Sequence, residues 1–340
     1  MKGRVYGVDA LRGLLACGVM LYHFLSWSNA TLYYTYKVFF EALSIYIVET
    51  FFIISGFSLF YVYHNKGGIS TYRDLKVFFL RRFYRIAPLF YTLLTAVVLI
   101  KLASPWLGIT INRPLDAYLL GVNFTFLYGI TNPADSLVVA GWSIGVEMTM
   151  YLLFPLMLLY VKDKMTSIKL LVLMLLAEAL YQSVFLDQTI EFYKQWKEHT
   201  YFINHLSFFS SGFLVYFIFK DLKIPSVLPL LLIPLLLILF GFSTIEEYTI
   251  GIGRYLWLVL CTGVVILFSL IDVKNKLLIH LGDLIYSIYL CHFFVYQIIS
   301  RIFESTIYIV LVSVVGTYIL ASILYKYIEI PMIRYGRRYG

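Results

Sequence analysis

The chain has 340 residues, of which 61% are hydrophobic and 14% are charged, with a formal net charge of +8 and a mean hydropathy of +0.83. Soluble proteins are about half apolar and about a quarter charged, so this composition excludes a soluble globular protein and indicates an all-α polytopic membrane protein. The basic excess is typical of the cytosolic loops of such proteins, and no nucleic-acid-binding motif accompanies it. Cys17, Cys261 and Cys291 all lie in apolar segments without metal-site spacing, so we expect no metal and no disulfide framework.

Runs of about 20 apolar residues predict membrane-spanning helices. In chain order we expect ten of them, at 8–28, 43–63, 83–103, 142–161, 168–186, 200–219, 226–242, 252–271, 280–300 and 306–327. The stretch 104–141 mixes proline and asparagine with apolar residues. It is an outer loop, a re-entrant segment or an eleventh membrane helix.

Lysine and arginine predict the orientation of these spans. With the N-terminus in the cytosol, only seven of the 27 basic residues face the outer side, namely Lys37, Lys101, Arg113, Lys194, Lys197, Arg254 and Arg301. This asymmetry fits the positive-inside rule with both termini cytosolic. The sequence shows no internal repeat and no linker, so we expect residues 1–340 to form a single membrane domain.

Two ionisable residues share one face of the first predicted helix. Arg12 and His23 are separated by about three helical turns plus 20°, which is a rise of roughly 16 Å. Ionisable side chains at membrane depth normally face a protein interior or a wet cavity. Snorkelling or an ion pair with Asp9 also explains Arg12, and a hydrogen bond between helices also explains His23. Their common face favours a reaction path through the bilayer.

Two carboxylates are expected near the depth of His23. Glu49 lies near the outer end of the second predicted span, and Glu147 lies one to two turns inside the fourth. A carboxylate beside an imidazole fixes its tautomer and raises its basicity, as a general base requires. We expect Glu147 to orient His23, with Glu49 as the alternative. A hydrogen bond that only packs two helices is the other explanation of Glu147.

Two further groups of residues are candidates for binding. Arg82 and Arg85 are three residues apart on a predicted helix, where two guanidinium groups form a fork for phosphate or an anchor for lipid headgroups. Tyr286, Tyr289 and His292 share one face of the ninth predicted span. Aromatic stripes in membrane helices usually pack, whereas His292 is a second candidate for the site.

Taken in chain order, these motifs resemble the acyltransferase-3 family of integral-membrane acyltransferases, which includes bacterial O-acetyltransferases of surface polysaccharides. The resemblance runs from residue 4 to the end of the chain. It rests on Leu11-Arg12-Gly13 with His23, Glu49 to Phe57, Arg82-Phe83-Tyr84-Arg85, Trp142-Ser143 to Glu147 with Tyr151 and Pro155, Tyr286 to His292, and Glu329-Ile330-Pro331. Ser58 and Cys291 depart from the family pattern but leave the charged positions intact. Some relatives carry an additional SGNH hydrolase-like domain, for which this chain has no room.

The resemblance implies an enzyme of the bacterial cytoplasmic membrane, surrounded by membrane lipids. Its donor would be cytosolic acyl-CoA, most often acetyl-CoA, and its acceptor a hydroxyl of a glycan or lipid-linked saccharide. Arg82 and Arg85 would hold the phosphates of the donor, and Arg12 would guide the pantetheine arm.

The resemblance also implies a catalytic role for His23, as general base or as transient acyl carrier. Glu147 or Glu49 would support it. The residues that we expect to contact the substrate are Trp142, Tyr286 and His292.

A second hypothesis is a transporter or exporter of a glycan or lipid-linked intermediate, because buried charges also serve proton-coupled transport. The sequence shows no paired repeat halves of the kind that many transporters carry. Loss of the gene would remove the glycan if the protein is an exporter, and would leave an intact but unacylated glycan if it is an enzyme.

Overall fold

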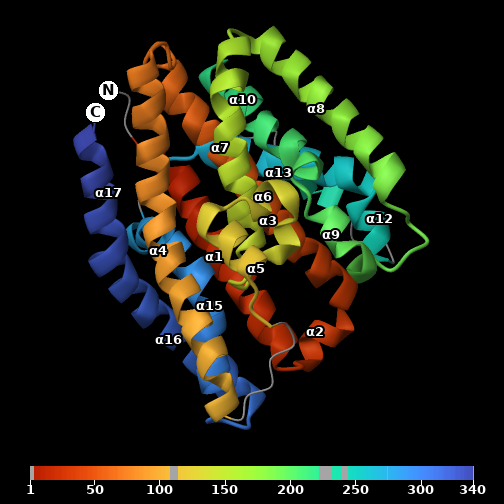
Figure 1. Ribbon diagram of the computed structural model, residues 1–340. Coiled ribbons are helices and arrows are strands. Elements are labelled where there is room, and N and C mark those ends of the chain that lie inside the picture. The colour runs from red at the N-terminus through yellow and green to blue at the C-terminus, as the bar shows by residue number, and fades with distance from the viewer. Residues whose placement is uncertain are drawn as a thin grey trace.

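The structure, a computed structural model, describes residues 4–107, 114–221, 232–233, 235–236, 238, 244–273 and 275–339. These residues form helices and connecting loops, without a β-strand. Figure 1 shows the long helices packed as a bundle, with the two ends of the chain marked at the same end of it. The all-α fold class expected from the sequence is confirmed.

The described residues of the first half of the chain form eight helices and one short 3₁₀ turn. They are α1 (Tyr6–Trp27), α2 (Thr31–Thr35), α3 (Lys37–His64), α4 (Tyr72–Leu107), α5 (Ala117–Thr125), α6 (Tyr128–Thr131), η1 (Pro133–Asp135), α7 (Trp142–Tyr160) and α8 (Lys164–Phe185). The described elements of the second half are η2 (Phe192–Gln195), α9 (Trp196–His199), η3 (Phe202–His205), α10 (Leu206–Asp221), α12 (Ile245–Thr249), α13 (Ile252–Leu270), α14 (Lys276–Asp283), α15 (Ile285–Ile299), α16 (Thr306–Leu324), the π-helical turn η4 (Tyr325–Glu329), α17 (Ile330–Gly336) and η5 (Arg337–Tyr339).

Eight of the described helices are long and apolar enough to cross a membrane, and a bent pair raises the number to nine. They coincide with nine of the ten predicted spans. The predicted span at 226–242 falls mostly outside the described residues. The span predicted at 280–300 corresponds to the bent pair α14 and α15, which meet at an angle of 71°. Gly282, just before the bend, lies directly against the backbone of Asp9, so α14 is pressed onto α1 before the chain turns.

The stretch after the third predicted span is now defined in part. Helix α4 is longer than expected and reaches Leu107. Beyond the undescribed residues 108–113, the longest helix before α7 is α5, which has nine residues. Nine residues rise only about 14 Å, which is less than half of a bilayer core. Residues 114–141 therefore contain no eleventh membrane-spanning helix.

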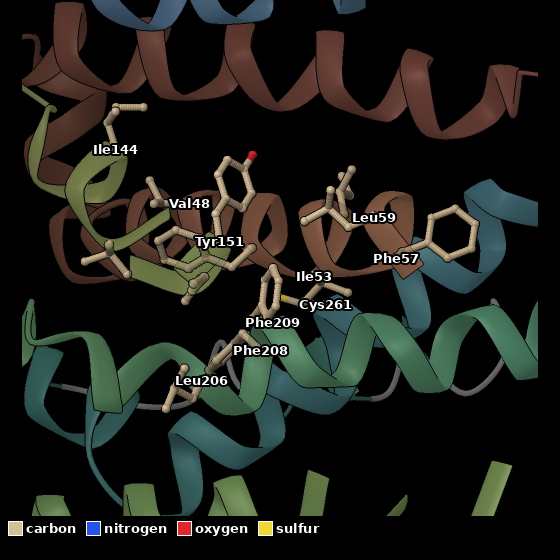
Figure 2. Packing of buried hydrophobic residues seen from close by; sticks show 14 of the residues in the cluster. Val48, Ile53, Phe57, Leu59, Ile144, Tyr151, Leu206, Phe208, Phe209 and Cys261 are labelled. Atoms are coloured by element: carbon tan, nitrogen blue, oxygen red, sulfur yellow. The ribbon is translucent and has the colours of Figure 1, made fainter. Parts of the chain in front are cut away.

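Helix α3 lies in the core and presents two differently used sides. Figure 2 shows Val48 and Tyr151 on one side of α3, and Phe208 and Phe209 of α10 on the other. On the α10 side, Gly56 lies so close to the backbone of Phe209 that a side chain at position 56 would overlap it. Small residues let membrane helices approach closely in this way. The other side of α3 is left to line cavities.

Candidate active site

A first cavity, of about 110 Å³, lies between α1, α3, α4, α7 and α15, and we call it the arginine cavity. Its charged lining consists of Arg12, Arg82, Arg85 and Glu147. The three arginines come from two separate helices, α1 and α4, and the fold brings them to one space. The sequence predicted these three residues as one binding group, and the structure places them together. Three guanidinium groups facing one carboxylate leave an excess of positive charge that suits an anion.

Arg12 is held in place on both sides. It donates hydrogen bonds to Asp9 at 3.1 Å and to Ser58 at 2.8 Å. The ion pair with Asp9 considered from the sequence therefore exists, and Arg12 lines the cavity as well. Ser58, which departs from the family pattern, supplies the anchor from α3. The guanidinium group of Arg82 lies over the ring of Tyr151 at 5.8 Å, a cation–π contact.

Glu147 belongs to the arginine cavity. Its Oε1 accepts hydrogen bonds from Ser55 at 2.8 Å and from Tyr151 at 2.5 Å. The expectation that Glu147 orients His23 is wrong, because these partners turn the carboxylate toward the arginines. The position of Glu147 along its helix predicts how deep the residue lies in the membrane. It does not predict the direction in which the side chain points around the helix axis.

A second cavity, of about 350 Å³, contains His23 and is called the histidine cavity. Three tryptophans line it: Trp27, Trp142 and Trp196. The ring of Trp27 stacks on His23 at 4.7 Å with an angle of 3° between the planes. Trp142, expected to contact substrate, thus lies in the same cavity as His23. Tyr286 instead lines the arginine cavity, where its hydroxyl donates to the carbonyl of Ile86 at 2.8 Å.

His23 is paired with a second histidine. Its Nδ1 lies 2.9 Å from Nε2 of His292 on α15, and the two rings are nearly coplanar. His292 is 1% exposed, and its Nδ1 lies 3.2 Å from the carbonyl oxygen of Ile288. The sequence named His292 as a candidate for substrate contact, and the structure makes it the hydrogen-bond partner of His23.

The backbone carbonyl decides the tautomers of the neutral pair. A carbonyl oxygen only accepts, so Nδ1 of His292 carries a hydrogen and its Nε2 is left as an acceptor. Nδ1 of His23 must then donate to that acceptor, and Nε2 of His23 holds a free lone pair. Because His23 lines the histidine cavity, this arrangement gives the cavity an imidazole ready to accept a proton.

Glu49 lies in a different place, in a buried cluster behind the histidine cavity. Its Oε1 accepts from His205 at 2.7 Å and from Arg254 at 2.9 Å, and all three side chains are 0% exposed. Arg254 also donates to Glu178 on α8 and to the carbonyl of Asn204. The alternative expectation, that Glu49 orients His23, is therefore wrong. Arg254, counted from the sequence among the basic residues of the outer side, is buried within α13.

A histidine next to this cluster is kept neutral. His199, in α9 outside the spans, is buried, and burial together with the positive charge of Arg254 holds the pKa of its imidazole well below the ordinary value. Its ring lies edge-on to His205 at 5.8 Å. Arg254 therefore supplies the permanent positive charge of the cluster and pairs with Glu49 and Glu178.

Several polar residues of the cavities were not among the site residues predicted from the sequence. Ser55, Ser58 and Tyr151 hold the charged groups of the arginine cavity, and Tyr289 lines both cavities. Tyr289 stood in the predicted aromatic stripe but was interpreted as packing. The small serines carry no signal in a single sequence, because serine is common wherever membrane helices pack.

Comparisons with known proteins identify the family of the chain. The family model described as an acyltransferase domain, that of the acyltransferase-3 family, matches residues 5–326. The chain is similar to the peptidoglycan O-acetyltransferase OatA of Listeria monocytogenes, with 23% identity over 98% of this chain and 56% of the relative. It thus spans about half the length of that curated relative. No solved structure matches the chain. The chain belongs to the acyltransferase-3 family of membrane acyltransferases.

Proposed function

We propose that this protein moves an acyl group, acetyl in the first place, from cytosolic acyl-CoA to a hydroxyl of a cell-surface or exported glycan. It would do so as a multi-pass protein of the bacterial cytoplasmic membrane. The observation that carries the proposal is the pair of adjoining cavities along α1. One holds the three arginines Arg12, Arg82 and Arg85, and the other holds the proton-accepting nitrogen of His23.

The arginine cavity suits the donor. The diphosphate of CoA carries negative charges that guanidinium groups bind through paired hydrogen bonds. Arg82 and Arg85 would bind these phosphates, and Arg12, fixed by Asp9 and Ser58, would guide the pantetheine arm along α1. The rise of roughly 16 Å from Arg12 to His23 is a length that an extended pantetheine arm covers.

The histidine cavity suits the acceptor and the chemistry. Nε2 of His23 would take the proton of the acceptor hydroxyl while its oxygen attacks the thioester carbonyl. The carbon–oxygen bond forms, the carbon–sulfur bond breaks, and the proton passes from His23 to the departing CoA thiolate. His292 would keep His23 in the required tautomer. Transient acylation of the same nitrogen is the other route open to this geometry.

The tryptophans of the histidine cavity support a saccharide acceptor. Flat indole rings pack against the C–H faces of sugars, and Trp27, Trp142 and Trp196 all line this space. The named activity of the relative, O-acetylation of peptidoglycan, makes peptidoglycan strands the first acceptor to test.

The replacement of His23 by alanine tests the proposal. We expect His23→Ala protein to insert in the membrane but to leave the cell-envelope glycan unacylated, as measured by mass spectrometry of released glycan. His64→Ala is the matched control, because His64 lies at the end of α3, packed on Phe60 at 4.7 Å and away from both cavities. Normal acylation by a well-expressed His23→Ala protein would contradict the proposal. Loss of the glycan itself would favour export instead.

A further inference from the structure

The two cavities share two wall residues. Val48 of α3 and Tyr289 of α15 line both the arginine cavity and the histidine cavity. We call this pair the neck. The boundary between the cavities also falls between two consecutive residues of α7: Ser143 lines the arginine cavity, and Trp142 lines the histidine cavity. A group that moves from one cavity to the other by the direct way therefore passes Tyr289.

Two hydrogen bonds hold the hydroxyl group of Tyr289 in place. Its hydroxyl donates to the carbonyl of Ala140 at 3.1 Å and shares a hydrogen bond of 2.8 Å with the hydroxyl of Ser143. Ala140 has a φ of +65°, a left-handed conformation that is uncommon for residues other than glycine. Strained backbone of this kind persists where surrounding contacts hold it and often marks functional sites. Here the strained residue supplies the carbonyl that fixes Tyr289.

The neck lies next to the histidine pair. Tyr289 precedes His292 by three residues on α15, a rise of about 4.5 Å, and the two rings are 6.3 Å apart. His292 in turn holds His23. An acyl group that has just passed the neck therefore arrives at the reacting imidazole, while the arm behind it still lies beside the neck.

We propose that Tyr289 is a specificity-determining residue: its ring limits the size of the acyl group that reaches His23, and its anchored hydroxyl keeps the neck closed in the absence of an acceptor. This inference rests on the proposed function, because it takes acyl-CoA as the group that passes. It also gives the anchor a purpose, since a closed neck keeps water from the thioester. Water attack would form a carbon–oxygen bond and break the carbon–sulfur bond, releasing free acid and CoA thiol.

The test measures the release of CoA thiol by the purified full-length protein from acetyl-CoA and butyryl-CoA, with and without peptidoglycan strands. Removing the ring in Tyr289→Ala should raise the ratio of butyryl to acetyl turnover about tenfold, the scale on which pockets distinguish one or two methylene groups. Tyr289→Phe keeps the ring and loses the anchor. It should keep the wild-type ratio and raise thiol release in the absence of acceptor.

Variants of Val48, the other residue of the neck, test the inference even if Tyr289→Ala does not fold. Val48→Ala should raise the butyryl to acetyl ratio, and Val48→Phe should lower it. Phe294→Ala is the control, because Phe294 is an aromatic residue of the same helix that packs on the core outside both cavities. Unchanged ratios in folded Tyr289→Ala, or in both Val48 variants, would overturn the inference. Wild-type protein that uses no acyl-CoA would instead contradict the proposed function.

Discussion

At the scale of single residues, the proposed chemistry depends on which ring nitrogen of His23 carries the hydrogen. The carbonyl of Ile288 sets the tautomer of His292, and His292 sets that of His23. A neutral histidine here does the orienting that a carboxylate does in many hydrolases. Because the orienting group is uncharged, the pair needs no counter-ion within the membrane.

Replacement of His292 tests this relay. His292→Ala removes the acceptor for Nδ1–H of His23, so we expect acyl transfer to peptidoglycan strands to fall by about a hundredfold or more. His292→Gln offers a carbonyl oxygen that also accepts, and should retain clearly more activity than His292→Ala. The measurement is kcat in detergent-purified protein. Equal activity of the two variants would contradict the orienting role.

If Arg85 binds the phosphates of the donor, its replacement should weaken the binding of acetyl-CoA but not of acetyl-pantetheine. Arg85→Gln should raise KM for acetyl-CoA about tenfold to a hundredfold, the value of one charge-assisted hydrogen bond. It should leave KM for acetyl-pantetheine, which has no phosphate, unchanged. Arg301→Gln is the control, because Arg301 is exposed and remote from the arginine cavity. A rise of KM for both donors would show that Arg85 acts otherwise than on phosphate.

The sequence predicted the residues of the site better than their partners. The helical spacing of Arg12 and His23 singled out both residues, and the family resemblance grouped Arg12 with Arg82 and Arg85. The partners of Glu49 and Glu147 depend on which way each helix is rotated, and hydropathy carries little information about rotation when a helix is apolar all round. Helix α3 is such a helix, with buried residues along most of its length.

At the scale of the helices, the buried cluster around Arg254 joins elements that are far apart in the sequence. Glu49 comes from α3, Glu178 from α8 and Arg254 from α13, while the carbonyl of Asn204 comes from the turn before α10. Removing one partner of a buried ion pair leaves the other charge uncompensated, which costs far more than the loss of an exposed pair. The cluster therefore fixes the rotation of the helices behind the histidine cavity.

A structural role for the cluster predicts that the replacement of Arg254 lowers the free energy of unfolding. Arg254→Leu should destabilise the protein by about 3–5 kcal/mol, because Glu49 and Glu178 stay buried without their cation. The matched control is Lys194→Leu, which breaks an exposed ion pair with Glu191 at 3.1 Å and should cost less than about 1 kcal/mol. Thermal unfolding of detergent-purified protein measures both, with labelling of the buried thiols Cys261 and Cys291 as the signal.

Glu49→Gln separates this structural role from a catalytic one. It should lower the melting temperature, and activity measured below that temperature should remain. If Glu49→Gln protein has full stability but no activity, the structural assignment is contradicted and Glu49 takes part in the reaction.

The elements themselves were largely predictable, with one instructive exception. Long apolar runs predict spanning helices because the bilayer core sets their length. The bend between α14 and α15 was missed, although Gly282 and Asp283 interrupt the apolar run just before Leu284. At this point Gly282 lies against the backbone of Asp9 in α1, a tertiary contact that the local sequence does not predict.

At the scale of the whole molecule, the proposed path of the acyl group runs along α1 from the arginine cavity, past Tyr289, to His23. The predicted topology puts the arginines near the cytosol and His23 near the outer surface. The protein would then let a donor and an acceptor that never share a compartment react within the membrane.

The most direct test of this claim is transfer across a sealed bilayer. Purified protein is placed in liposomes, with radiolabelled acetyl-CoA only on the side of Arg82 and Arg85 and peptidoglycan strands only on the other side. Labelling of the strands' hydroxyl groups by wild-type protein, and not by His23→Ala protein, is the predicted result. Label that reaches the strands only when both substrates are on the same side, or equally with His23→Ala, would contradict the account.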